Sequence, residues 1–176
     1  TFSNKAYLSA WQDVAMLGIN RDPASGAMAQ TGKASALVRL ESYDTNAFMT
    51  FQTSATNNAE PTERMRIDKD GKVGIGTTSP DQTAHVMKGS AGSIASDSNA
   101  VLTIENSDTA VLQILCPEAN NGYILMGNPN DGNADGRLRY NNSTREMSLW
   151  TAGTERLTID SAGKVGIGEA DPDTIL

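Results

Sequence analysis

The stretch TERMRIDKDGKVGIGTTSP, from Thr62 to Pro80, returns as TERLTIDSAGKVGIGEADP from Thr154 to Pro172. The two copies align without a gap at a constant offset of 92 residues, and twelve of their nineteen positions are identical. Because the identities include polar and glycine positions, hydrophobic patterning alone does not account for them. Such a repeat indicates an array built from copies of one unit, and arrays are typical of stalks, fibres and binding surfaces.

Each copy of the repeat has the pattern of a β-hairpin. In the first copy, Met65 and Ile67 alternate with charged residues, and the alternation resumes at Val73 and Ile75. The intervening Asp-Lys-Asp-Gly segment predicts a tight turn, because glycine accepts the positive φ that the turn needs. The equivalent apolar residues of the second copy are Leu157, Ile159, Val165 and Ile167, and its turn reads Asp-Ser-Ala-Gly. We expect both apolar sets to form core or intersubunit contacts.

Glycines interrupt the returning strand of each hairpin at every second position, as Gly74 and Gly76 in the first copy and Gly166 and Gly168 in the second. Glycines placed in this way predict a bend or the close approach of another backbone. In a fibre, that backbone would belong to a neighbouring subunit near the axis. The proline that follows in each copy is expected to end the strand, because proline cannot donate to a β-ladder.

The repeat and the polar, turn-rich composition predict a mainly β chain with two units in series. We expect a β-rich unit at 1–80, a linker at 81–98 and a second β-rich unit at 99–176. Units this short bury proportionally little surface, so stacking or oligomerisation is expected to supply extra core. Within the linker, Ala84 to Met87 is a candidate for a short strand. Further strands are predicted at 36–41, 47–52, 101–105, 111–115, 123–126, 137–140 and 147–151.

Charge and cysteine content narrow the classes of function. The net charge of −7 argues against a nucleic-acid partner, whose phosphates are bound by Lys and Arg, and against an anionic membrane surface. No apolar stretch reaches the length of a membrane span. The single cysteine, Cys116, ends an apolar run and is expected to be a buried, inert thiol.

Motifs for catalysis, cofactors and metals are weak in this sequence. The lysine of GKVGIGT precedes the glycines, so the segment is not a phosphate-binding loop. His85 is the only histidine, which excludes a site built from several imidazoles of one chain, and we expect it to lie in a strand or linker. Asp68 and Asp70 resemble the opening of a calcium loop, but no late Glu follows, and a hairpin turn is preferred. The sequence therefore predicts no catalytic, cofactor-binding or metal-binding residue.

Aromatic and polar loop residues are the remaining candidates for ligand binding. Trp150 lies in an alternating stretch and is expected to be buried, whereas Tyr140, beside two asparagines, is expected at the surface. The Asn- and Asp-rich segment 128–135 could bind a cation at a trimer interface but is more typical of an exposed loop. The aromatic residues able to stack on sugars if exposed are Trp11, Tyr43, Tyr123, Tyr140 and Trp150.

The pattern ERMRIDKDGKVGIGTTSPDQTAHV, with its Asp-Gly turn, VGIGTTSP and following HV, resembles the repeats of bacteriophage tail-fibre and related virion-appendage proteins. The resemblance covers 62–86 and 154–172. It implies an elongated, homotrimeric fibre whose units are β-sandwiches or β-prisms, located on the virion tail or capsid. The implied partners are other virion structural proteins and a host-surface glycan or protein, with no cofactor, no nucleic acid and no membrane insertion.

The function expected on this basis is a non-enzymatic, structural one, in a viral fibre segment involved in host-surface attachment. Two alternatives stay open. One is a capsular-polysaccharide depolymerase carried on a fibre, which would use a pair of Asp or Glu side chains that the sequence does not single out. The other is a cellular surface adhesin with the same kind of β repeat.

Overall fold

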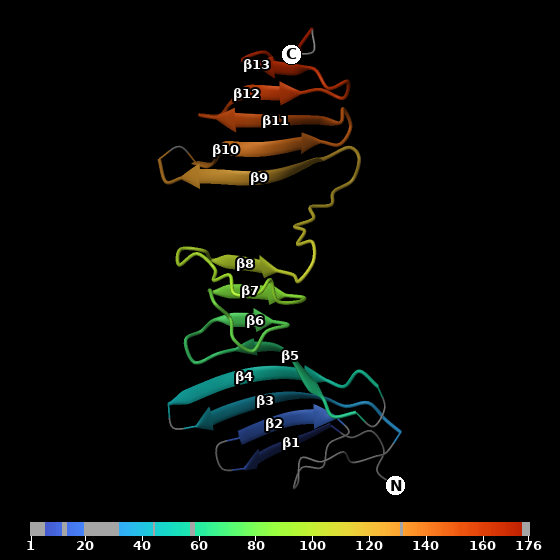
Figure 1. Cartoon of the computed structure of the whole chain (residues 1–176), viewed down its shortest axis with the longest axis vertical. Coiled ribbons are helices and arrows are strands. Elements are labelled where there is room, and N and C mark those ends of the chain that lie inside the picture. The colour runs from blue at the N-terminus through green and yellow to red at the C-terminus, as the bar shows by residue number, and fades with distance from the viewer. Residues whose placement is uncertain are drawn as a thin grey trace. The chain divides into compact units, whose positions relative to one another are not determined.

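The computed structural model of the chain describes residues 6–11, 14–19, 32–43, 45–56, 59–130 and 132–173, with only the backbone for 6–11 and 133. The chain divides into two compact units, Thr1–Val111 and Leu112–Leu176. All regular structure in the described ranges is β-strand, and each unit holds one sheet (Figure 1). The prediction of a mainly β chain is therefore confirmed.

The sheet of the first unit contains eight strands that lie side by side in chain order (Figure 1). The pairs from β1 to β6 are antiparallel, whereas β6 pairs with β7, and β7 with β8, in parallel. The strands are β1 (Ala6–Trp11), β2 (Val14–Ile19), β3 (Ala36–Tyr43), β4 (Asn46–Thr53), β5 (Thr62–Ile67), β6 (Val73–Ile75), β7 (Ala84–Met87) and β8 (Leu102–Glu105).

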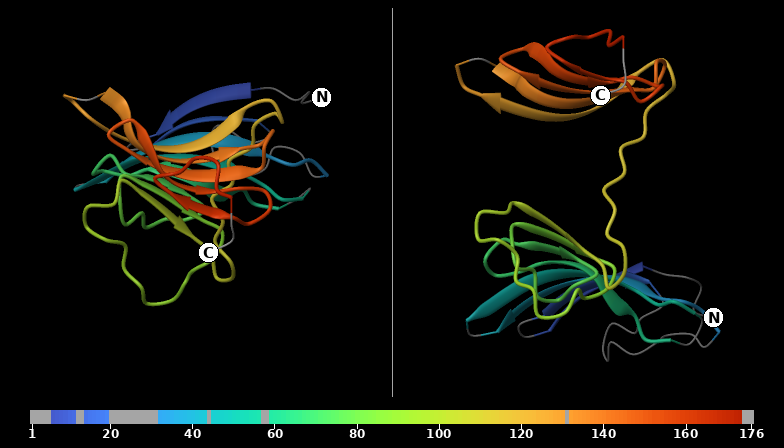
Figure 2. Two further views of the ribbon diagram at one scale, coloured as in Figure 1. Left: turned by 90° about the horizontal axis from the view of Figure 1, so that it is seen from above. Right: turned by 45° about the horizontal axis from the view of Figure 1, so that its top comes forward.

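The sheet of the second unit contains five antiparallel strands, again in chain order. In Figure 2 each sheet, taken by itself, is a single twisted layer. The strands are β9 (Asn121–Asn128), β10 (Gly132–Asn141), β11 (Glu146–Thr151), β12 (Thr154–Ile159) and β13 (Val165–Ile167).

The two predicted hairpins are present as β5–β6 and β12–β13, and one aspartate organises each turn. The Asp68 carboxylate accepts hydrogen bonds from the backbone N–H groups of Asp70 and Lys72, both at 2.9 Å. Asp160 accepts the equivalent pair from Ala162 and Lys164, both at 2.8 Å. The third turn position donates its backbone N–H to this aspartate in both copies, so Asp70 in the first copy and Ala162 in the second both complete the turn. This use of Asp68 supports the turn interpretation over a calcium loop.

A β-bulge precedes each hairpin at the same place in the repeat. The pairing of β4 with β5 steps over Arg64, and the pairing of β11 with β12 steps over Arg156. Each bulged arginine donates from Nε to a threonine on the neighbouring strand, at 3.0 Å and 3.2 Å. The bulge turns the preceding glutamate, Glu63 or Glu155, onto the same face as the residue three positions later. The repeated TER triplet thus specifies a local backbone geometry.

The strand predictions differ from the structure in three respects. The strand expected at 111–115 is absent, and this apolar run pairs with none of the strands that the structure describes. Strands β1 and β2 were not predicted. The remaining predicted strands are present, and most of them extend one to five residues further than expected at one or both ends.

The division of the chain also differs from the expected 1–80, 81–98 and 99–176. The segment expected to be a linker contains β7, which pairs with β6, and β8 then pairs with β7. Both strands therefore extend the first sheet, and the first unit reaches Val111. The Gly- and Ser-rich composition of this region indicates the loop between two parallel strands, where we expected a boundary.

Candidate interaction surface

Each sheet presents one face that carries mainly apolar or small side chains, here called the apolar face; the charged exceptions named above are the bulged Arg64 and Arg156, whose threonine partners lie on it. Residues opposite one another on paired strands share a face, and the next residue points to the other face. In the first unit the large apolar side chains of this face are Leu17, Ile19, Val38, Leu40, Met49, Phe51, Met65, Ile67, Val73, Ile75, Val86, Leu102 and Ile104. In the second unit they are Ile124, Met126, Leu138, Tyr140, Met147, Leu149, Leu157, Ile159, Val165 and Ile167.

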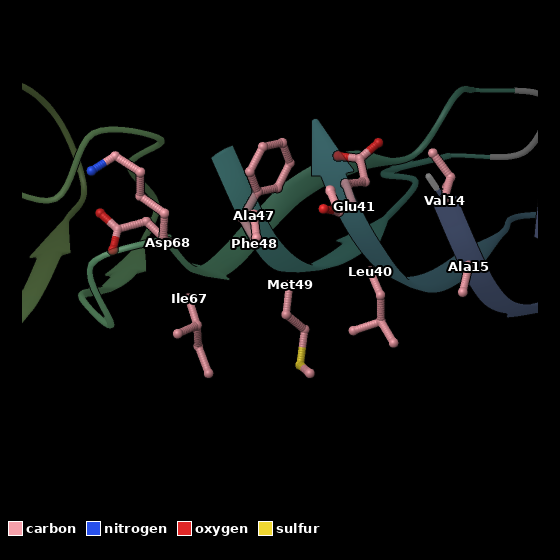
Figure 3. A pocket seen from close by; sticks show the side chains of 11 residues that line it. Val14, Ala15, Leu40, Glu41, Ala47, Phe48, Met49, Ile67 and Asp68 are labelled. Atoms are coloured by element: carbon pink, nitrogen blue, oxygen red, sulfur yellow. The ribbon is translucent and has the colours of Figure 1, made fainter. Parts of the chain in front are cut away.

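Among the described residues of a single copy, many large side chains of the apolar face are exposed. Of the nineteen exposed large apolar side chains in the described strands, sixteen lie on this face. Leu149 is 45% exposed and Met126 is 56% exposed. Figure 3 shows the arrangement at one end of the first sheet, where Leu40, Met49 and Ile67 project from one side of the ribbon and Glu41 from the other. Contiguous apolar patches of this kind mark interaction sites.

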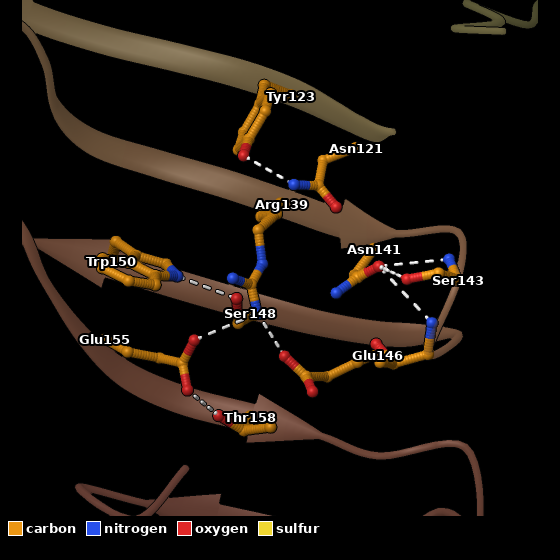
Figure 4. A network of polar contacts seen from close by, with 11 residues as sticks. Asn121, Tyr123, Arg139, Asn141, Ser143, Glu146, Ser148, Trp150, Glu155 and Thr158 are labelled. Atoms are coloured by element: carbon orange, nitrogen blue, oxygen red, sulfur yellow. Dashed lines mark hydrogen bonds and ion pairs between the residues drawn. The ribbon is translucent and has the colours of Figure 1, made fainter. Parts of the chain in front are cut away.

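The opposite face, here called the polar face, is held together by charged and hydroxyl side chains. In the second unit Arg139 contacts the carboxylates of Glu146 and Glu155, the latter at 3.3 Å (Figure 4). Glu155 also accepts a hydrogen bond from the Thr158 hydroxyl at 2.6 Å. Both carboxylates are therefore engaged by one guanidinium, which favours a structural role for them.

Trp150 covers the middle of this polar face. Its indole N–H donates to the Ser148 hydroxyl at 2.8 Å (Figure 4). The Arg137 guanidinium lies 4.0 Å from the ring centroid. A cation over an indole face is an attractive arrangement worth about 0.5–2 kcal/mol. Under this cover Ser148 and Thr158 are fully buried. Trp150 itself is only half-buried, so the expectation of a buried side chain was partly wrong.

The polar face of the first unit follows the same plan. Arg66 donates two hydrogen bonds to Glu63, at 2.5 Å and 2.7 Å, and its guanidinium lies 5.0 Å from the Phe48 ring centroid. The hydrogen bond to Glu63 raises the pKa of Arg66. Thr50, between these residues, is fully buried and accepts a hydrogen bond from Gln52. The bidentate pair depends on the bulge, because only the bulge places Glu63 and Arg66 on one face.

His85 lies in strand β7, and a strand was one of the two locations expected for it. Its side chain is only 3% exposed. Its Nδ1 accepts a hydrogen bond from the Asp81 backbone N–H at 3.4 Å, so Nε2 carries the proton and donates to Glu105 at 2.9 Å. Glu105 also accepts from the Ala91 N–H at 2.5 Å, and this bond is the main cause that lowers the pKa of Glu105. The histidine therefore ties the segment before β7 to β8, and Glu105 ties the loop after β7 to β8.

The backbone that closely approaches the hairpin glycines belongs to the same chain. A Cβ on Gly74 would lie 2.6 Å from the Thr77 carbonyl oxygen, and one on Gly166 would collide with the carbonyl of Glu169. A Cβ on Gly76 would collide with the carbonyl of Met87 at the end of β7. The predicted close approach is present, but no neighbouring subunit is needed to explain it.

The expectation of a buried thiol at Cys116 was wrong. Its side chain is half-buried and accepts a hydrogen bond from the Asn142 amide at 2.9 Å. The preceding apolar residues are also exposed, Leu112 by 65% and Leu115 by 81%. The run was expected to lie in a strand, and without strand pairing it leaves these side chains open to solvent.

The remaining aromatic candidates do not gather at one site. Tyr140 is 40% exposed, as expected, and lies on the apolar face. Tyr43 and Tyr123 lie on the polar faces of different units, and their hydroxyls contact Glu41 and Asn121. The Trp11 side chain lies outside the described residues.

Hollows in the surface are open and follow the sheet. One of about 630 Å³ wraps around the ends of β2 to β5 and is lined from both faces (Figure 3).

Within the described residues, no group of three or more His, Cys, Asp or Glu side chains is placed to hold a metal ion. Asn128 and Gly132 of the Asn- and Asp-rich segment pair with each other between β9 and β10. No helix in the described part of the chain is long and apolar enough to cross a membrane.

The sequence interpretation missed the polar face entirely. Its members come from several strands, and only the cross-strand register brings Arg139, Glu146 and Glu155 together. The repeated TER triplet was the available signal, because an identical charged triplet in both copies indicates a specific geometry.

No family model and no curated protein sequence matches this chain.

Proposed function

We propose that this chain is a structural, non-enzymatic segment of a virion fibre or appendage that acts in host-surface attachment as a homotrimer. The observation that carries the proposal is the uncovered apolar face of each sheet. Three copies arranged around an axis as a β-prism, with their apolar faces inward, would cover these faces with one another. The resemblance of the VGIGTTSP hairpins to fibre repeats points in the same direction.

The energy available from the apolar faces is large enough for stable assembly. Full burial of a Leu, Ile or Met side chain contributes about 1.5–3 kcal/mol, so each half-exposed one would gain about 1 kcal/mol. Thirteen exposed Leu, Ile and Met side chains lie on the apolar faces of each chain, so their summed gain of about 13 kcal/mol per chain is comparable to the association cost of roughly 4–15 kcal/mol. The apolar faces are therefore sufficient to drive association.

The polar faces suit the outer surface of such a fibre. Their charged groups are already paired within one chain, as in the Arg66–Glu63 and Arg139–Glu146 pairs. These pairs need no partner from another chain, and the polar faces would present a hydrated surface to solvent. Threefold repetition of any weak contact between this surface and a host glycan or protein would raise the overall avidity.

The test is the solution mass of the protein, measured by light scattering during size exclusion over a range of concentrations. We expect a trimer for the natural chain. The double variant Leu40→Lys with Leu149→Lys puts one charge on each apolar face and should be monomeric, because an unpaired charge is costly to bury.

The matched control is Tyr43→Lys with Leu125→Lys. These residues have exposures similar to those of Leu40 and Leu149 but lie on the polar faces. The control should remain a trimer. A natural chain that stays monomeric at all concentrations, or a control that dissociates as readily as the test variant, contradicts the proposal. Sugar release from host capsule by the purified chain would instead favour a depolymerase.

A further inference from the structure

The two hairpins of the repeat have the same geometry up to their last strand. In the first, Arg66 pairs with Gly74, and in the second Thr158 pairs with Gly166. The glycine that ends each returning strand donates its N–H to the bulged arginine's carbonyl, at 2.9 Å in both copies. The outer edges of β6 and β13 are therefore equivalent surfaces, and what lies against them can be compared directly.

The outer edge of β6 is occupied by β7, which pairs with it in parallel. The Val73 N–H donates to the Thr83 carbonyl at 2.8 Å, just before β7 begins. At the other end of the pair, the Met87 carbonyl lies where a Cβ on Gly76 would be. Gly76 thus leaves room for β7 as well as supplying the positive φ of +76° that the turn needs.

The outer edge of β13 is the end of the second sheet. Gly168 has the same turn conformation as Gly76, with φ of +72°, but among the described residues no atom lies within 4 Å of a Cβ built on it. Ile167 is 75% exposed, compared with 44% for the equivalent Ile75. Among the residues that the structure describes, none therefore fills beside β13 the place that β7 fills beside β6.

We propose that the outer edge of β13 is a binding site for an extended peptide segment of the β7 type, paired in parallel. The chemistry of the occupant follows from β7. Small or β-branched side chains, as at Ala84 and Val86, would lie beside Val165 and Ile167 on the apolar face. A polar side chain, as at His85, would lie over Gly166 on the polar face. This inference is independent of trimer formation.

The test uses the chain of 176 residues and a synthetic peptide with the sequence of residues 81–88, acetylated and amidated at its ends. Binding is measured by fluorescence anisotropy of a labelled peptide, and the site is located by hydrogen exchange. We expect saturable binding and about tenfold slower exchange at Val165 and Ile167. Exchange at Val73 and Ile75 should not change, because β7 already covers that edge. A scrambled peptide should not bind.

Two variants of one substitution locate the site on the protein. Gly168→Asn adds a Cβ where the carbonyl of the incoming strand must lie, and Asn tolerates positive φ. It should weaken peptide binding at least tenfold. Gly163→Asn makes the same change at the turn glycine of the hairpin, which also has a positive φ, +82°. The bound peptide is not expected to contact this turn, so the variant should leave binding unchanged.

Three results would overturn the inference. The first is the absence of saturable binding to the natural chain, and the second is equal binding by Gly168→Asn and Gly163→Asn. The third is protection of Val165 and Ile167 that rises with protein concentration without peptide, which would show that β13 of a second copy occupies the edge. Exchange of the β11 and β12 amides reports whether each variant is folded.

Discussion

Single residues of the hairpin are constrained by backbone contacts within the chain. Gly166 is the clearest case, because it is buried and a side chain there would meet the carbonyl of Glu169 and the ring of Pro172. Neither neighbour is the end of a flexible side chain, so the backbone itself would have to shift. The glycine therefore contributes to the stability of each copy before any assembly takes place.

Gly166→Ala should lower the free energy of unfolding of the second unit by about 1–3 kcal/mol, the usual cost of overpacking. Gly122→Ala is the control, because its Cβ would meet the side chain of Ile114 at an ordinary 3.6 Å. The control should be neutral or stabilising by up to about 1 kcal/mol. Urea denaturation followed by Trp150 fluorescence, in a Trp11→Phe background, measures both. Equal effects would show that the close contact is not limiting.

The stabilising contribution of Glu105 to the first unit should be lost in acid. Its pKa is lowered in the folded state, chiefly by the Ala91 N–H and also by His85. A carboxylate with a lowered folded pKa contributes stability above its unfolded pKa, and this contribution is lost as pH falls through the folded value. Glu105→Gln should therefore reduce Tm at neutral pH, and the difference from the natural chain should vanish at low pH. A difference in Tm that is independent of pH contradicts this account.

At the scale of the β-hairpin, the turn aspartate is the side chain that holds the turn together. Asp160→Ala removes the acceptor of two backbone N–H groups and should destabilise the second unit by about 1–2 kcal/mol. Asp160→Asn keeps an acceptor oxygen in the same position and should cost less than half as much. Thermal unfolding of the two variants separates the possibilities, since equal losses would show that the charge, and not the turn geometry, matters.

The hairpins could be predicted from sequence because their signals are local. Alternation, an Asx turn and a turn glycine all fall within a few residues, and the same holds for the short strand β7. The polar face could not be predicted, since Arg139 meets its carboxylates only through the register of three strands. The apolar run before Cys116 has the composition of a strand, but strand formation requires pairing, and the run pairs with no strand in the described part of the chain. The bulge at Arg156 inserts one residue into the ladder, which the alternation pattern alone does not register.

For the whole molecule, the apolar run at 111–115 offers a separate measure of assembly. Leu112 and Leu115 are more than half exposed in one copy, and the run pairs with no described strand. Exposed backbone of this kind is open to thermolysin, which cleaves before Leu and Ile. If the trimer covers this run together with the apolar faces, cleavage there should be about tenfold slower in the natural chain than in the monomeric Leu40→Lys, Leu149→Lys variant.

The matched control for cleavage is again the variant with lysines on the polar faces, Tyr43→Lys with Leu125→Lys. It should be as resistant as the natural chain, because its apolar faces are unchanged. Cleavage sites are assigned by mass spectrometry of the first fragments, so that cuts elsewhere do not enter the comparison. Equal rates in the trimer and the monomeric variant would mean that assembly leaves the run uncovered, and the trimer contacts would then be confined to the two sheets.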